Sequence, residues 1–452
     1  MVFAGIGAGI NELTALAVTS ELAPTRKRGT YVSILVFTIV PFCPSVLWAQ
    51  LIASHTTWRY VGLFCGLWAF IGLVMTAVFY FPPPRINANG LSRREILRRI
   101  DFVGGLLSIA GMILFLAGLL WGGYQVYYTT SSLSLNTKCD SQTDTRKQYK
   151  WTSAHVLAPL LVGAFLLTAF VLWELYGTEY PMFPGRIKKE PRILILTLII
   201  TFISGANFFS VLLFWPTQAF NAYGHDPIGV GLRGVPIGFS ILAGACIVLW
   251  LLSMYRGGNR LFLFVSSCLM TAGCGALASA RLDNLNTVYG ILVVAGLGIG
   301  GIVVPASIIT TIICPSDLIA TVTALTLAVR VIGGAVGYTI YYNVFINKFV
   351  PIATKTIGTA CVMHNITDPK LIGEVIELTG ASLIEGILEI PGVDGNTTTW
   401  HSLVLAGQQS YAAAYPYVYY TSIAFGVISC ISSLFLGDIR KYMNEHVAVV
   451  ME

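Results

Sequence analysis

The chain has 452 residues, of which 55% are hydrophobic and only 11% are charged, and its mean hydropathy is +0.75. A soluble domain carries about a quarter of its residues as charges, so this composition excludes an ordinary soluble protein and favours an all-α polytopic membrane protein. The formal net charge of +6 does not indicate nucleic-acid binding, because the basic residues form no large, aromatic-rich cluster. The nine cysteines form no CxxC pair and have no histidine at metal-ligand spacing, so we expect neither a metal site nor a cofactor.

Eleven stretches are long and apolar enough to cross a bilayer, which takes about 20 residues. Basic residues gather in alternate connections, such as 26–28 and 186–192, and we expect those connections and the C-terminus to be cytoplasmic. An odd number of spans then places Met1 outside, so we expect helices to be missing from the N-terminal end. The stretches are 2–21, 31–54, 58–81, 103–123, 154–176, 193–215, 228–252, 260–280, 286–311, 318–346 and 416–437.

The first span contains a carboxylate at a depth where charge is expensive. Glu12 lies near the middle of the span, beside Asn11. An ionisable group there costs several kcal/mol unless it faces a cavity or a partner. Glu12 therefore either couples proton or substrate movement in a central cavity, with Asn11 nearby, or is neutralised by a hydrogen bond within the helix bundle.

Prolines and glycines shape several spans. Pro41 and Pro44 lie in the second span, where they free backbone carbonyls and predict a kink that can act as a hinge. Small residues let neighbouring helix backbones approach closely. We expect such packing at Gly5, Gly7, Gly9, Gly296, Gly298, Gly300, Gly333, Gly334 and Gly337.

The connection at residues 82–102 is rich in arginine. Ser92 and Glu95 form a capping box, and the arginines that follow predict a short basic amphipathic helix at the membrane surface. The alternative is an ordinary loop that obeys the positive-inside rule. The loop at 124–153 is polar and is expected on the outside.

The tenth span carries an arginine near its middle. Arg330 cannot lose its charge, so it requires a carboxylate, a cage of carbonyls or water, and Glu12 is one candidate partner. A cavity for an amphipathic molecule also needs polar edges and aromatic faces. Arg330 therefore joins Asn207, Gln218 and Tyr338 as a candidate for the lining of a substrate cavity.

Other polar and aromatic residues lie near span ends. Glu174 and Arg233 are placed to extend towards the membrane surface. Trp215, Tyr341 and Tyr342 either line a cavity or belong to the belt of aromatic residues at the interface between lipid and water, and their positions near span ends favour the belt.

The loop at 347–415 is long and is expected on the outside. Asn365 and Asn396 each begin an N-x-T glycosylation pattern. Cys139 and Cys361 are the two cysteines in the long outside loops, where they either form a disulfide or remain free thiols.

The same loop offers no catalytic set. Residues 368–386 can form a short helix, but His364 and His401 have no serine or cysteine partner in a recognisable elbow. We therefore do not expect an enzyme.

Several motifs together resemble the major facilitator superfamily, in particular its fourteen-helix drug:proton antiporter branch and the fungal trichothecene efflux pump group. A sister group, the fungal siderophore-iron transporters, is similar in architecture. The motifs are GIGAGINELTALAVTSELAPTRKRG (5–29), WRYVGLFCG (58–66), FPPPRINANGLSRREILRRIDFVGG (81–105), LAGLLWGGYQ (116–125), GLGIGGIVVPASI (296–308) and AVRVIGGAVGYTIY (328–341).

The resemblance implies a major facilitator fold that lacks its first three transmembrane helices. Residues 1–81 would be the three-helix remainder of the N-terminal half, and 82–102 a cytoplasmic basic linker. Residues 103–192 would hold the extra two-helix pair. Residues 193–452 would be the C-terminal half with its large outside loop.

The resemblance also implies alternating access, with a hydrophobic small molecule leaving as protons enter. The proton gradient would be the energy source, and Glu12 the proton-coupling candidate. The expected partners are a small-molecule substrate, such as a trichothecene-like toxin or drug, and the lipid bilayer. The full-length protein would be a monomer in the plasma membrane.

Two alternatives stay open at this point. The first keeps the transporter class but reverses its direction, as uptake of an iron–siderophore complex. The second is a non-transporting membrane sensor or an inactive truncated remnant.

Overall fold

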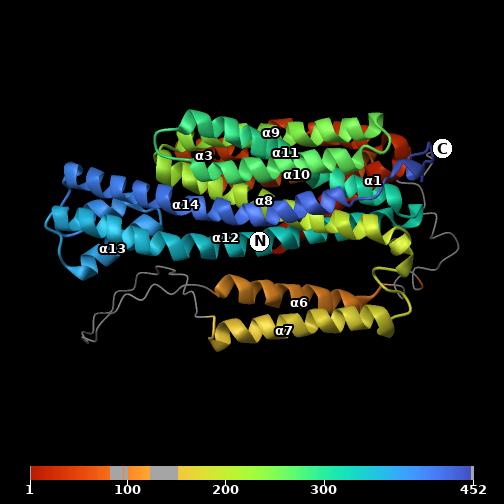
Figure 1. Cartoon of the computed structure of the whole chain (residues 1–452), viewed down its shortest axis with the longest axis horizontal. Coiled ribbons are helices and arrows are strands. Elements are labelled where there is room, and N and C mark those ends of the chain that lie inside the picture. Colours follow the sequence, from red (N-terminus) through yellow and green to blue (C-terminus); the bar gives the residue numbers. More distant parts are fainter. Residues whose placement is uncertain (1, 82–94, 96–99, 123–150, 449–452) are drawn as a thin grey trace. The chain divides into compact units, whose positions relative to one another are not determined.

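The computed structural model describes residues 2–81, 95, 100–122 and 151–448, with the backbone alone at 188 and 189. All regular secondary structure in these residues is helical, which confirms the all-α expectation. Ten of the helices are long and apolar enough to cross a membrane. The chain divides into two compact units, and two of the four chain positions at which they meet fall inside long helices, α12 and α14 (Figure 1).

The first unit contains residues 1–101, 180–338 and 418–452. Its centre is a group of buried helices in which α11 packs against α8, α9 and α10. Its helices are α1 (Val2–Leu22), α2 (Arg28–Phe37), α3 (Ser45–His55), α4 (Arg59–Phe79), α8 (Pro191–Tyr223), α9 (Pro227–Met254), α10 (Asn259–Ala276), α11 (Leu285–Ile313), the start of α12 (Ile319–Met363) and the end of α14 (Thr397–Leu434).

The second expected span is broken into separate helices. α2 ends at Phe37, a single 3₁₀ turn covers Val40–Phe42, and α3 begins at Ser45. Pro41 lies in the turn and Pro44 immediately precedes α3, because neither can donate the backbone hydrogen bond that would continue a helix. The break explains why ten continuous helices, rather than eleven, are long enough to span. Motion about this break remains a prediction.

Three glycines of α11 lie close against two neighbouring helices. A Cβ at Gly296 would meet Ser240 of α9, and one at Gly300 would meet the Ile241 carbonyl of the same helix. Gly298 lies instead against the backbone of Met270 in α10. These glycines therefore have a packing role.

Close packing at the glycines of α1 stays a prediction. Outside the backbone of α1 itself, no atom of the described residues lies within 4 Å of the position that a Cβ would take at Gly5, Gly7 or Gly9. The composition of a helix face shows that it can pack closely, but not whether a neighbouring helix lies there.

The second unit contains residues 102–179 and 339–417. α6 (Phe102–Trp121) packs against α7 (Ala154–Leu172), which continues into a π-helical turn at Trp173–Gly177. Glycine again makes the contact close, since Gly163 of α7 meets the backbone of Phe115, and Gly118 of α6 meets that of Leu160.

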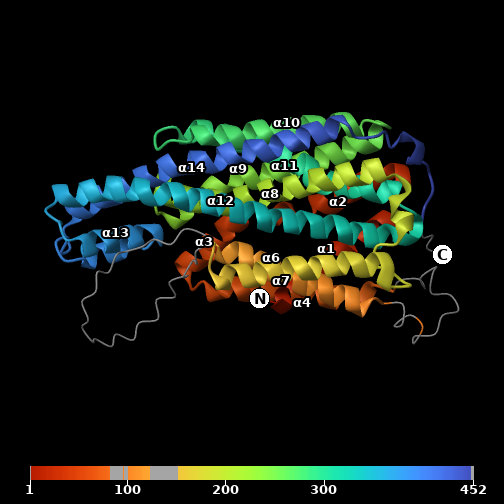
Figure 2. The same cartoon turned by 60° about the horizontal axis from the view of Figure 1, so that its bottom comes forward.

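The expected 347–415 loop is largely helical. α12 continues to Met363 and α14 begins at Thr397, so both helices extend past the expected span ends at 346 and 416. Aromatic rings stabilise these extensions, with Phe349 of α12 4.4 Å from Tyr411 of α14 between ring centroids. The short helix expected within 368–386 is confirmed as α13 (Pro369–Gly380), which lies beside α12 (Figure 2).

Candidate site around the Arg330–Glu12 pair

The central feature of the first unit is an ion pair between two apolar helices. Arg330 of α12 donates from Nη2 to Oε1 of Glu12 in α1, and their side chains are 7% and 48% exposed. The structure thus brings the arginine to the carboxylate considered as its partner. A permanently charged guanidinium at this depth is stabilised mainly by such a partner.

Close packing between α8 and α12 fixes the position of Arg330. A Cβ at Gly205 of α8 would overlap the Arg330 carbonyl, and one at Gly333 of α12 would overlap the carbonyl of Phe202. One turn further, Gly337 lies against Ala206. The backbone that carries Arg330 is therefore held rigidly, and Gly205 is a positioning residue that the sequence analysis missed.

The guanidinium retains hydrogen-bonding capacity beyond Glu12. Its Nε atom is buried and has no hydrogen-bond partner among the described residues. A buried donor of this kind favours an additional acceptor, such as water or a ligand oxygen.

The polar cavity candidates occupy one side of α8. Asn207, Phe214 and Gln218 follow helical spacing along it, and both polar residues are buried. The Phe214 ring lies 5.3 Å from that of Tyr338, between centroids. Asn11 is exposed on α1, and no hydrogen bond or ion pair among the described residues joins its side chain to this group.

Gln218 has a partner that the sequence analysis did not single out. Its Oε1 accepts a 2.5 Å hydrogen bond from the hydroxyl of Tyr419 in α14, and both side chains are buried. The cluster of tyrosines at 415–420 was the available signal. The sequence shows several tyrosines near a span, but it does not show which of their side chains is buried in the helix bundle.

Arg233 and Trp215 together stabilise the end of α8. Arg233 donates from Nη1 to the carbonyls of Ala219 and Gly224 at 3.1 and 3.0 Å, as suits a cation at a helix C-terminus. Trp215 is fully buried and donates from Nε1 to the Arg233 carbonyl at 2.8 Å. Assigning Trp215 to the interfacial belt was wrong, and so was the same assignment for the buried Tyr341.

Arg28 was counted among the cytoplasmic surface charges, but its side chain is buried. It donates from Nη1 to the carbonyl of Thr311 at 2.6 Å, in the last turn of α11. The adjacent Gly29 lets α2 lie close to α9, because a Cβ there would collide with the Leu249 carbonyl of α9. Arg28 therefore joins α2 to α11 at the C-terminal end of the α11 dipole.

The modification sites stay predictions. Asn365 and Asn396 are both exposed, although the Asn396 side chain also accepts a 3.0 Å bond from the backbone of Thr398. Cys361 is buried, whereas Cys139 lies outside the described residues. Ser92 of the capping box also lies outside them, and so does the 124–150 part of the polar loop.

The apolar helices, with an ion pair held between two of them, define a multi-pass integral membrane protein. The chain belongs to the fungal trichothecene efflux pump (TRI12) family, which it matches over residues 1–451. This confirms the family indicated by the sequence motifs.

Individual relatives carry the names of pumps and transporters rather than of enzymes. The chain is 26% identical to "Trichothecene efflux pump TRI12" of Fusarium sporotrichioides, over 88% of this chain and 63% of that protein. It is 26% identical to "MFS-type transporter FPY5" of Fusarium mangiferae, over 81% and 60%. It is 25% identical to "Trichothecene efflux pump TRI12" of Trichoderma arundinaceum, over 88% and 64%. The chain thus spans less than two thirds of the length of these relatives.

Proposed function

We propose that the protein acts in secondary active transport, in which a hydrophobic small molecule leaves the cell as protons enter. The observation that carries the proposal is the pairing of Arg330 with Glu12 between apolar helices. Family membership and the names of the relatives support the transporter class. The proton gradient is the energy source, and the reaction needs no cofactor.

Glu12 has the chemistry required of a coupling group. As a carboxylate it neutralises the adjacent guanidinium of Arg330, and protonation removes that attraction. Arg330 cannot itself release a proton, so only the protonation of Glu12 can change the charge of the pair. Proton binding at Glu12 thereby releases Arg330, whose buried Nε already has bonding capacity to spare. Alternating access follows if the two pairing states favour different helix arrangements.

The substrate is a hydrophobic molecule with a few polar groups, of the trichothecene-like toxin or drug class. Asn207, Gln218 and Tyr338 provide polar edges and an aromatic face along α8 and α12, and Asn11 lies beside Glu12. The basic connections support a cytoplasmic C-terminus. We place the protein in the plasma membrane as a monomer.

Export can be tested in a yeast strain that lacks its own drug exporters. Expression of the chain should lower the accumulation of a hydrophobic fluorescent toxin, and a protonophore should abolish the difference. Glu12→Gln should abolish export, since it keeps the size and hydrogen bonding of the side chain but cannot titrate. The control is Asp283→Asn, which removes an exposed carboxylate outside the spans.

Different results have different meanings. Unchanged export by Glu12→Gln would remove Glu12 from the coupling mechanism. No effect on toxin accumulation, together with rescue of siderophore-dependent growth under iron limitation, would replace export with uptake.

A further inference from the structure

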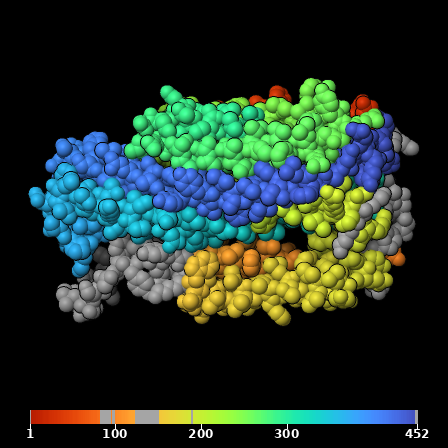
Figure 3. Space-filling model, viewed as in Figure 1, coloured from red at the N-terminus to blue at the C-terminus, as the bar shows by residue number. Residues whose placement is uncertain are grey.

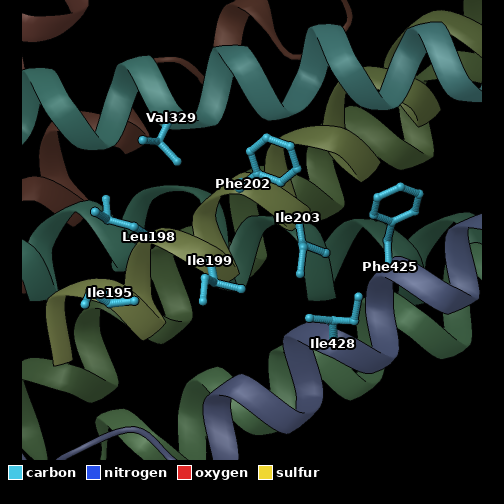
Figure 4. Close-up of a pocket in the computed structure, with 8 residues that line it drawn as sticks. All are labelled: Ile195, Leu198, Ile199, Phe202, Ile203, Val329, Phe425 and Ile428. Atoms are coloured by element: carbon cyan, nitrogen blue, oxygen red, sulfur yellow. The ribbon is translucent and has the colours of Figure 1, made fainter. Parts of the chain in front are cut away.

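An apolar groove lies on the first unit, between α8, α12 and α14. It has a volume of about 420 Å³ and is lined entirely by aliphatic and aromatic side chains. Figure 4 shows Val329 of α12 and Phe425 and Ile428 of α14 around the residues of α8. The remaining lining residues are Ile195, Leu198, Ile199, Phe202 and Ile203.

The groove opens to the surface of the membrane-spanning helices. Ile195 and Ile428 are 55% and 50% exposed, and the α14 segment forms part of the surface in Figure 3. At Gly205 and Gly333 the backbones of α8 and α12 approach each other closely, so these two walls of the groove are packed together. On a membrane-spanning segment, such an opening faces acyl chains rather than water.

A cation lies at the end of the groove where α8 begins. Arg192, Ile195 and Ile199 lie three and four residues apart, which places them along one face of α8. Arg192 donates from Nε to the carbonyl of Phe435 at 2.9 Å. Phe435 lies seven residues after Ile428 and directly follows the end of α14, so Arg192 joins the α8 and α14 walls of the groove at this end.

The charge of Arg192 is available to a ligand. Arg192 is exposed and takes part in none of the ion pairs among the described residues. The nearby carboxylate of Glu190 is occupied by Lys441, and by the hydroxyl of Tyr442 at 2.6 Å. The guanidinium therefore offers its remaining N–H groups at the level where a helix leaves the membrane.

We propose that this groove is a binding site for an anionic phospholipid. One acyl chain fills the apolar groove, and the phosphate accepts hydrogen bonds from the guanidinium of Arg192. The lipid belongs to the leaflet in which α8 begins, which is the cytoplasmic leaflet in the orientation proposed above. The site does not depend on transport activity.

Lipid titration of the purified, delipidated chain in detergent tests the site. Native mass spectrometry should show tighter binding of phosphatidylglycerol than of phosphatidylcholine with the same acyl chains. Arg192→Gln should weaken phosphatidylglycerol binding about fivefold, whereas Arg192→Lys should retain most of it. Arg256→Gln is the control, because Arg256 is also exposed and lies in another connection.

The acyl-chain half of the site has its own test. Ile199→Trp should fill the groove and abolish selective binding, whereas Ile247→Trp adds the same ring to an exposed position of α9 outside the groove. Phe425→Trp adds a tryptophan within the groove to the nine of the chain, and phosphatidylglycerol with brominated chains should quench this variant more than the unmodified chain. Equal binding of the two lipids would overturn the proposal, and so would binding that neither Arg192→Gln nor Ile199→Trp changes. Equal quenching of the folded Phe425→Trp variant and the unmodified chain would also overturn it.

Discussion

Two kinds of residue are decisive in the first unit: charged residues between apolar helices, and glycines at which helix backbones meet. Arg330 and Glu12 carry charge between apolar helices, and the glycines around them carry no side chain at all. The two kinds depend on each other, because the backbone of Arg330 can approach α8 only where Gly205 leaves room. The packing glycine is thus as specific a requirement as the charge.

Gly205→Ala should reduce the free energy of unfolding by about 1–3 kcal/mol and so lower the melting temperature. The added methyl group overlaps the Arg330 carbonyl, which is backbone and cannot turn away. Differential scanning fluorimetry in detergent measures the change. Gly290→Ala is the matched control, because a Cβ at Gly290 meets nothing within 4 Å. Equal melting temperatures for the two variants would contradict the packing role of Gly205.

His225 should make stability depend on acidity. It lies between α8 and α9 with its ring against Phe220, and burial, followed by the nearby Arg233, lowers its pKa below 6.5. The folded state disfavours the protonated ring. The contribution of the neutral His225 ring to the free energy of unfolding is therefore complete above pH 6.5 and is lost as pH falls through the lowered pKa. His225→Gln should therefore reduce the drop in melting temperature between pH 7 and pH 5. His401→Gln, at an exposed position, should leave that drop unchanged.

At the scale of elements, the ends of helices connect parts of the chain that are distant in sequence. Arg28 joins α2 to α11, and the backbone of the 25–26 segment donates to the carbonyls of His446 and Asn444 near the C-terminus, at 3.0 and 2.9 Å. Basic residues of this connection therefore have structural partners in distant parts of the chain.

Arg28→Ala should destabilise the protein by about 1.5–3 kcal/mol, because it removes a buried charged donor from the Thr311 carbonyl. Lys27→Ala removes the same charge from the adjacent exposed position and should have little effect. Thermal unfolding of the two variants compares them directly. Equal losses would mean that positive charge in this connection matters rather than the Arg28 hydrogen bond.

At the scale of the whole molecule, topology determines which face of the membrane each connection reaches. The basic connections predict that residues 347–415 lie outside, where Asn365 and Asn396 would meet the glycosylation machinery. Both asparagines are exposed and adjoin helices that the structure describes.

Expression in a yeast secretory system tests this orientation. The protein should migrate faster on gels after treatment with a glycosidase, and the double variant Asn365→Gln and Asn396→Gln should show no such shift. An absence of glycan on the unmodified chain, with a tag at Glu452 accessible only from outside, would reverse the proposed orientation.

The sequence by itself determined the helical class, the family and most spans, because hydrophobic length and glycine content are local properties. It also identified Arg330 and Glu12, since charge in an apolar run is visible without a structure. Tertiary structure alone decided that these two residues meet, that Arg28 and Trp215 are buried, and that Gly5, Gly7 and Gly9 meet no neighbour among the described residues. The physical reason is that burial and pairing depend on which helices become neighbours. The periodicity of one helix shows which of its faces are alike, but not what each face touches.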